Sequence, residues 1–169
     1  MTAHQFKYLV IADDSAEFPA ALAYAAHRVK VTTGALVILR VVDTVTDNAH
    51  WVSVGEEMRA EALEASEALA ERLAAETWAE TGVQPEIIIR EGETRAEIRR
   101  YIDEDQDIRI IVLGAGVGRD GPGPLVGAVA KGQGLASRAI PVLIVPGSLT
   151  REEARRLATP DPGDPGAPV

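Results

Sequence analysis

Five short apolar runs recur along the chain, and β-branched residues dominate them. Nearly continuous Val, Ile and Leu are typical of parallel strands that helices cover on both faces. The stretches between the runs are long enough to hold a helix each. Strands are therefore expected at residues 6–12, 35–42, 84–90, 107–113 and 141–146.

The segments between these runs carry apolar side chains at helical spacing. The longest segment has glutamates on its wet side and an apolar stripe made of Met58, Ala62, Ala65, Leu69, Leu73 and Trp78. A loop or lid is expected at residues 43–53. Helices are expected at 17–32, 54–81, from 94 onward, and 125–138, followed by a short charged helix at 150–157.

Residues that favour helix ends mark several of these boundaries. Ser15 is a candidate N-cap for the first helix. Thr94 is a candidate N-cap for the third, and Glu97 three residues later completes a capping box. Gly132 and Gly134 fall inside the fourth predicted helix, where each weakens it by roughly 1 kcal/mol relative to Ala.

Strands that alternate with helices through right-handed crossovers form a parallel doubly wound sheet. We therefore predict an α/β fold with one domain over residues 1–147. Its five-stranded, mostly parallel sheet has helices on both faces. Residues 148–169 are expected to be a charged segment followed by a Pro/Gly-rich disordered tail.

Ligands of such sheets bind outside the carboxyl ends of the strands, at the point where the strand order reverses. In this chain those ends carry Asp13, Val41, Glu91 and Gly114. The cleft between them is the default site.

Composition narrows the classes of function. The 169 residues carry a formal net charge of −9, which argues against nucleic acid or an anionic membrane as the main partner. The chain has no cysteine, so disulfides, thiolate zinc sites and a Cys nucleophile are excluded. The first residues lack the pattern of a signal peptide. No apolar run approaches the roughly 20 residues of a membrane-spanning helix.

The glycine-rich loop after the fourth predicted strand is the strongest candidate for chemistry. A strand, a glycine loop and a helix start can together direct backbone amides at a phosphate. Residues 116–121 match Gly-x-Gly-x-x-Gly, but 122–124 (Pro-Gly-Pro) follow instead of a helix, so the match is weak. The Gly-x4-Gly-Lys pattern fails because Gln133 stands where lysine is required.

Residues 6–146 resemble the universal stress protein family. The resemblance rests on Asp13-Asp14-Ser15 after the first strand, Val41-Val42-Asp43 after the second, the late glycine loop and helix, and the closing strand 141–146. It implies a Rossmann-like fold of the adenine nucleotide alpha hydrolase type.

Nucleotide-binding members of that family carry Gly-x2-Gly-x9-Gly-Ser/Thr after the fourth strand. Gly114 and Gly127 match the first and third glycines, whereas Val117 replaces the second and Ala128 replaces the hydroxyl residue. A lost hydrogen bond to a charged group weakens binding by about tenfold or more. Restoring glycine and serine at these two positions is therefore expected to raise ATP affinity.

The resemblance implies contacts to an adenine nucleotide, each with a structural alternative. Asp13 and Val41 would lie on the adenine side, although Asp13 can also orient the turn and Val41 can belong to the core. The residues expected around ribose and phosphates are Gly114, Gly116, Gly118, Gly127 and Ala128.

The function implied is that of a cytoplasmic stress-response protein that binds an adenine nucleotide, ATP with Mg²⁺, without catalysis. The resemblance also implies a homodimer formed through Pro141–Pro146, because an exposed edge strand pairs readily. The alternative for that edge is coverage by residues 151–157. The alternative function is a nucleotide-free, dimeric protein-interaction module.

Overall fold

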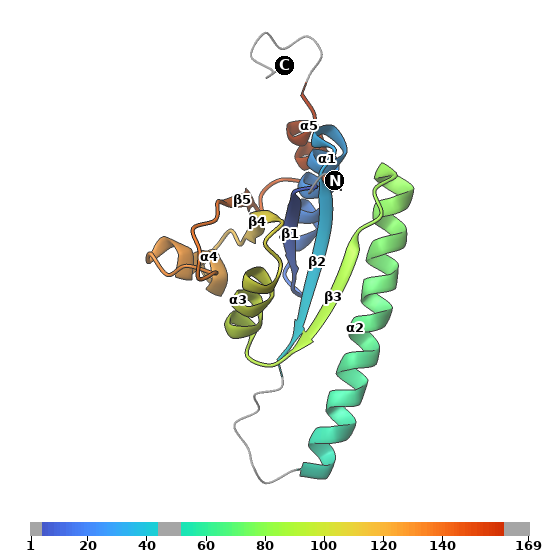
Figure 1. Ribbon diagram of the computed structural model, residues 1–169, viewed down its shortest axis with the longest axis vertical. Helices are drawn as coiled ribbons and strands as arrows, with labels where there is room; N and C mark the ends of the chain where they lie inside the picture. Colours follow the sequence, from blue (N-terminus) through green and yellow to red (C-terminus); the bar gives the residue numbers. More distant parts are fainter. Residues whose placement is uncertain (1–4, 44–51, 161–169) are drawn as a thin grey trace.

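A computed structural model describes residues 5–43 and 52–160 of the chain. It contains five strands and five helices in alternation (Figure 1). The elements are β1 (Lys7–Ala12), α1 (Phe18–Thr32), β2 (Ala35–Val42), α2 (Val52–Thr81), β3 (Glu86–Glu91), α3 (Thr94–Glu104), β4 (Ile108–Ala115), α4 (Pro124–Ala130), β5 (Val142–Pro146) and α5 (Arg151–Ala158).

The five strands form one parallel sheet in the order β3-β2-β1-β4-β5. The predicted α/β class and parallel sheet are confirmed. β1 lies at the centre, where Leu9 and Val10 are fully buried. The order reverses between β1 and β4, so the carboxyl ends of these two strands flank the switch point.

The sheet separates two apolar layers. One layer packs α1, α2 and α5 against side chains such as Val10 and Ile38. The other packs α3 and α4 against Leu9 and Val37. Helices therefore cover both faces, as the continuous apolar runs predict.

The first and third helices begin within one residue of their predicted starts, but both predicted N-caps are wrong. α1 begins after Glu17, and Ser15 instead donates its backbone N–H and hydroxyl to the carboxylate of Asp13. α3 begins at Thr94, and Glu93 is its N-cap, accepting from the amides of Arg95 and Ala96. At α3 a carboxylate takes the place expected for a neutral hydroxyl as acceptor for the free backbone N–H groups, because charge strengthens the hydrogen bond. At α1 the N-cap Glu17 makes no side-chain capping hydrogen bond.

The fourth helix is shorter than predicted. α4 ends at Ala130, and Gly132 has a positive φ of 75°. That backbone conformation favours glycine over other residues, so Gly132 ends the helix instead of weakening its middle.

The buried stripe of α2 differs from the predicted one. Met58 and Trp78 are exposed, and so is Ala65. The buried side chains are Ser66, Ala70, Leu73, Thr77 and Thr81. The amino-terminal part of α2 extends past the carboxyl ends of β2 and β3 (Figure 1). Of the predicted loop 43–53, residues 44–51 lie outside the described residues, as does 161–169 of the predicted tail.

The charged segment after β5 is helical, and α5 packs on α1. Ala154 and Ala158 have no exposed surface, and Ala154 belongs to the core layer of α1. A capping box between Thr150 and Glu153 begins the helix. Two small side chains at i and i+4 let the highly charged α5 approach α1 closely. β5 is the outermost strand on this side, and its backbone pairs with β4.

Candidate functional site

A cleft of about 850 Å³ opens at the carboxyl ends of β1 and β2. Its floor is Ile11, Ala12, Val41 and Val42 at the ends of these strands. One wall is α2, and the opposite wall is the start of α3 with Pro124 and Leu125 of α4. We call this space the large cleft.

Apolar side chains make up much of the large cleft. Its apolar lining includes Val41 of β2 together with Ala62, Ala65 and Leu69 of α2. Small and branched side chains leave a broad apolar surface. Pockets that bind small molecules commonly combine such apolar walls with a few polar groups.

Three arginines also line the large cleft. Arg40 is paired with Asp14 at 2.9 Å and donates to the carbonyl of Ala12 at 3.3 Å. Arg72 approaches Glu76 at 4.0 Å. In the described part of the chain, the guanidinium of Arg95 has no ion-pair partner, which leaves its donors available to an anionic ligand.

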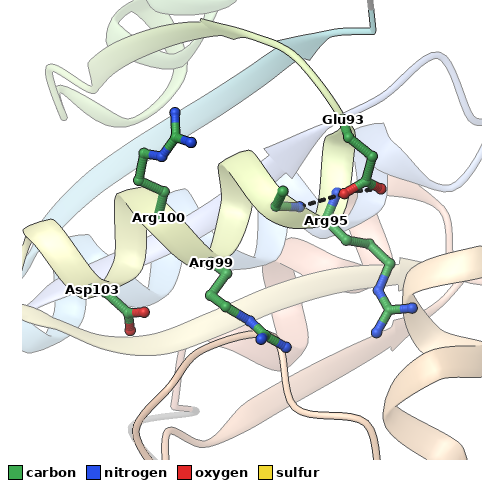
Figure 2. A pocket seen from close by; sticks show the side chains of 6 residues that line it. Glu93, Arg95, Arg99, Arg100 and Asp103 are labelled. Carbon is green, nitrogen blue, oxygen red and sulfur yellow. Dashed lines mark hydrogen bonds between the residues drawn. The ribbon is translucent and has the colours of Figure 1, made fainter. Parts of the chain in front are cut away.

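Arg95 also borders a groove of about 420 Å³ on α3 (Figure 2). Figure 2 shows Arg95 and Arg99 projecting from one side of α3 and Arg100 from the other. Arg100 pairs with Glu97 at 2.8 Å. Hydrogen bonds from the side chain and backbone of Ser137 lower the pKa of Asp103, at the far end of the groove.

Asp13 lines the large cleft and also holds its own turn. Its Oδ1 accepts from the backbone N–H of Ser15 at 3.1 Å and from its hydroxyl at 2.5 Å. Asp13 therefore orients the turn after β1, which is the structural alternative to a ligand contact. Its exposed carboxylate still borders the large cleft and a second, smaller cavity at this end of the sheet.

The second cavity lies at the switch point and measures about 80 Å³. It is lined by Asp13, Ser15 and Glu17 on one side and by Gly114 with residues 122–126 on the other. We call it the loop pocket. None of its lining residues is a lysine or arginine, and two are carboxylates.

Glu17 occupies a slot that glycines leave open beside the loop pocket. A methyl group on Gly114 would lie 2.8 Å from Cγ of Glu17, and one on Gly116 would lie 3.1 Å from its Oε1. A methyl group on Gly147 would lie 3.0 Å from its Cβ. Because these three glycines have no side chains, they leave room for the side chain of Glu17.

The structure brings only part of the predicted site together. Asp13 and Val41 share the large cleft, and Gly114 lines the loop pocket. The predicted residues that line neither cavity are Gly116, Gly118, Gly127 and Ala128. Ala128 is buried within α4.

Val117 avoids the strain that its β-branched side chain would meet at positive φ. Gly118 takes the positive φ of 125° instead, and Val117 is 65% exposed. The loop thus absorbs the replacement locally, as its flanking glycines allow.

Sequence reasoning missed Glu17, Arg72 and Arg95. The first turn after a strand end is a signal that could have found Glu17 and Arg95, because such turns face the carboxyl edge of a parallel sheet. Arg72 sits in the middle of a long helix, and only the packing of α2 brings it to the cleft.

Within residues 5–43 and 52–160, no group of three or more His, Asp or Glu is placed to hold a metal ion. None of the helices in these ranges has the length together with the apolar character of a membrane-spanning segment.

Comparisons with known proteins agree with this architecture. A model of the universal stress protein family matches residues 6–146. A universal stress protein from Lactobacillus plantarum is 24% identical and superposes with a TM-score of 0.68, over 85% of this chain and 99% of that one. No curated protein matches the chain.

Two other similar structures contain adenine nucleotides. A universal stress protein from Archaeoglobus fulgidus in complex with dAMP is 16% identical, with a TM-score of 0.57 over 84% of this chain and 98% of that one. A universal stress protein in complex with cAMP is 16% identical, with a TM-score of 0.58 over 86% of this chain and 100% of that one. At these identities the likeness to each structure shows the fold.

Proposed function

The chain belongs to the universal stress protein family, and from that membership we propose that it binds an adenine nucleotide in the large cleft. Its role is binding and not catalysis. The base lies against the apolar floor near Val41, and Asp13 borders the same space. The ligand's negative charge faces the arginines of the cleft, Arg95 above all, because its guanidinium has no ion-pair partner in the described chain.

One observation carries this proposal. Asp13 and Val41, for which the family resemblance implies adenine contacts, both line the large cleft of about 850 Å³. Pockets that bind small molecules commonly have about 300–1,000 Å³. The dAMP and cAMP complexes of proteins with this fold support the choice of ligand class.

The test combines two measurements: which nucleotide the purified protein retains, and how tightly added nucleotides bind. Nucleotide released from the denatured purified protein is identified by mass spectrometry, and AMP, ADP and ATP with Mg²⁺ are titrated by calorimetry. The variant Ala65→Trp fills the cleft from an exposed position on α2. Ala68→Trp places the same side chain at an exposed position that does not line the cleft.

We expect micromolar binding of at least one nucleotide by the wild type and by Ala68→Trp, and a loss of about tenfold or more in Ala65→Trp. Absence of retained nucleotide, with no heat from any of the three ligands at millimolar concentration, contradicts the proposal.

We also propose that the protein is a homodimer joined through β5. The strand is outermost, and Ile144 is 42% exposed on it. An open apolar edge favours pairing with a second copy of the same strand. In sedimentation experiments Ile144→Lys should give monomers. Leu157→Lys, at an exposed leucine on α5, should stay dimeric, and a monomeric wild type would overturn the dimer.

A nucleotide-free interaction module is the second candidate. The observation that favours it is Glu17, whose side chain takes space beside the glycine loop. If the titrations above fail while the dimer is present, this second function replaces the first.

A further inference from the structure

Glu17 is an unusual residue for the place it holds. It is the N-cap of α1, where Ser, Thr, Asp or Asn normally accept hydrogen bonds from the first amides. Its side chain makes no capping hydrogen bond. It lies instead beside Gly114 and Gly116, where it borders the loop pocket.

The charge of the loop pocket disfavours phosphate. Asp13 and Glu17 supply two carboxylates to its lining, and among the described residues no lysine or arginine lines it. Pro124, at the start of α4, has no backbone N–H and offers no donor to an anion. A phosphate entering here would meet like charge at close range.

The size of the loop pocket disfavours it as well. Its volume is about 80 Å³, about half of the ~150 Å³ of a cavity that admits benzene. A chain of two or three phosphates needs more room than this. The large cleft next to it has about ten times the volume and carries the arginines.

We propose that Glu17 is a specificity-determining residue that closes the loop pocket to the β- and γ-phosphates of a nucleotide. The large cleft then takes an adenine nucleoside monophosphate in preference to ATP. This inference rests on the proposed function, because it names which member of the ligand class fits the same site.

Calorimetry of AMP and ATP with Mg²⁺ tests the inference on four full-length proteins. They are the wild type, Glu17→Ala, Glu17→Gln and Asp120→Ala. Glu17→Gln removes the charge and keeps the volume, whereas Glu17→Ala removes both. Asp120→Ala removes one exposed negative charge from the glycine loop between β4 and α4, at a position that lines neither cavity. Thermal melting followed by circular dichroism confirms that each variant is folded.

The wild type should bind AMP about tenfold or more tightly than ATP. Glu17→Ala should raise ATP affinity about tenfold and leave AMP affinity within about threefold, with Glu17→Gln between it and the wild type. Asp120→Ala should leave the ATP to AMP ratio unchanged.

Other results overturn the inference. If AMP binds but Glu17→Ala does not change the ratio, Glu17 does not set specificity and the proposed function stands. An equal change in Asp120→Ala would mean that net charge alone acts. If neither nucleotide binds to the wild type or to Glu17→Ala, the proposed function fails together with the inference.

Discussion

The loop pocket and the large cleft lie side by side at the carboxyl edge of one sheet, yet they have opposite characters. The loop pocket sits at the switch point between β1 and β4, is lined by two carboxylates and measures about 80 Å³. The large cleft lies over β1 and β2, carries three arginines and measures about 850 Å³. Topology therefore places the site only approximately, and the side chains at the edge decide which space a ligand can use.

The same comparison changes the meaning of the glycine loop. Glycines after a strand can bring backbone amides close to a phosphate. Here Gly114 and Gly116 bring the backbone close to Glu17 instead. A glycine pattern shows that something approaches the chain closely and does not show what approaches.

The largest expected effect comes from filling the slot of Glu17. Gly114→Ala puts a methyl group 2.8 Å from Cγ of Glu17 and 3.0 Å from its backbone carbon and oxygen. Because backbone atoms cannot move aside cheaply, the free energy of unfolding should fall by about 1–3 kcal/mol. Urea denaturation measures the change.

Gly127→Ala is the matched control for that substitution. A methyl group at Gly127, inside α4, meets nothing within 4 Å. It should leave stability unchanged or raise it by about 0.5–1 kcal/mol. If the two alanine variants are equally stable, Glu17 is not packed against the loop as described.

Removing the available cation from the large cleft should have the next largest effect. Arg95→Ala should weaken AMP binding by about tenfold, because a hydrogen bond to a charged group contributes roughly 1.5–3 kcal/mol. Adenosine, which has no phosphate, should bind within about twofold of its wild-type affinity. Calorimetry with both ligands shows whether Arg95 acts through the phosphate charge or through the shape of the cleft.

Arg99→Ala controls for the loss of an arginine from α3. Arg99 projects from the same side of the helix and borders the groove in Figure 2, but it does not line the large cleft. AMP affinity should stay within about twofold. Equal losses for AMP and adenosine in Arg95→Ala would show that Arg95 shapes the cleft without contacting phosphate.

A residue outside both cavities gives a smaller effect that concerns stability alone. The hydroxyl of Tyr101 is buried without a hydrogen-bond partner in the described chain. Tyr101→Phe should raise the free energy of unfolding by about 1 kcal/mol, because it removes an unsatisfied polar group. The ring stays under Arg90. A loss of stability, or a change in AMP affinity, would contradict this account.

The same tyrosine predicts a response to alkaline pH. Burial, and then the charges of Glu86 and Asp105, raise its pKa to about 12 from its ordinary value of 10. Between these values the unfolded chain loses the proton and the folded chain keeps it, so stability falls as pH rises.

Lys7 acts in the same direction at alkaline pH. Burial alone would lower its pKa, but hydrogen bonds to Asp105 and Glu86 outweigh that effect and raise it. Its contribution is complete below its ordinary pKa and is lost as pH rises through the folded value.

Because the Tyr101→Phe variant lacks the titrating hydroxyl, its stability should fall less steeply than that of the wild type above pH 10. The variant keeps the contribution of Lys7, so some loss should remain. Thermal melts across that pH range measure the difference.

The smallest expected effect is at Val117. The sequence motif alone predicts that restoring glycine there, with serine at Ala128, raises ATP affinity. Val117 is exposed and lines neither cavity, whereas Glu17 still closes the loop pocket. Val117→Gly should therefore change ATP affinity by no more than about twofold in calorimetry. A tenfold gain would mean that the loop governs binding without Glu17.

The sheet was predictable because its information is local. Apolar β-branched runs, such as 35–42, specify a strand covered on both faces without any knowledge of its neighbours. All of the predicted strand bounds agree with the structure within two residues. The N-cap of the first helix was harder to assign, because the hydroxyl of Ser15 donates to Asp13 and does not cap the helix.

The site was only partly predictable because it depends on packing between distant segments. Asp13 and Val41 reach the cleft directly, since strand ends meet at one edge. Glu17 lies beside Gly114 across nearly a hundred residues of sequence, and no periodicity reports that approach. The prediction of which α2 residues are buried failed for a related reason. Small polar residues of this helix, such as Ser66 and Thr77, are buried, whereas Trp78 is exposed.

The crystal structure of the protein with AMP tests the central claim most directly. The account predicts adenine against Val41 in the large cleft, the phosphate within hydrogen-bond distance of Arg95, and the Glu17 side chain still beside Gly114 and Gly116. A phosphate seated on the glycine loop, with Glu17 displaced from its slot, would contradict it.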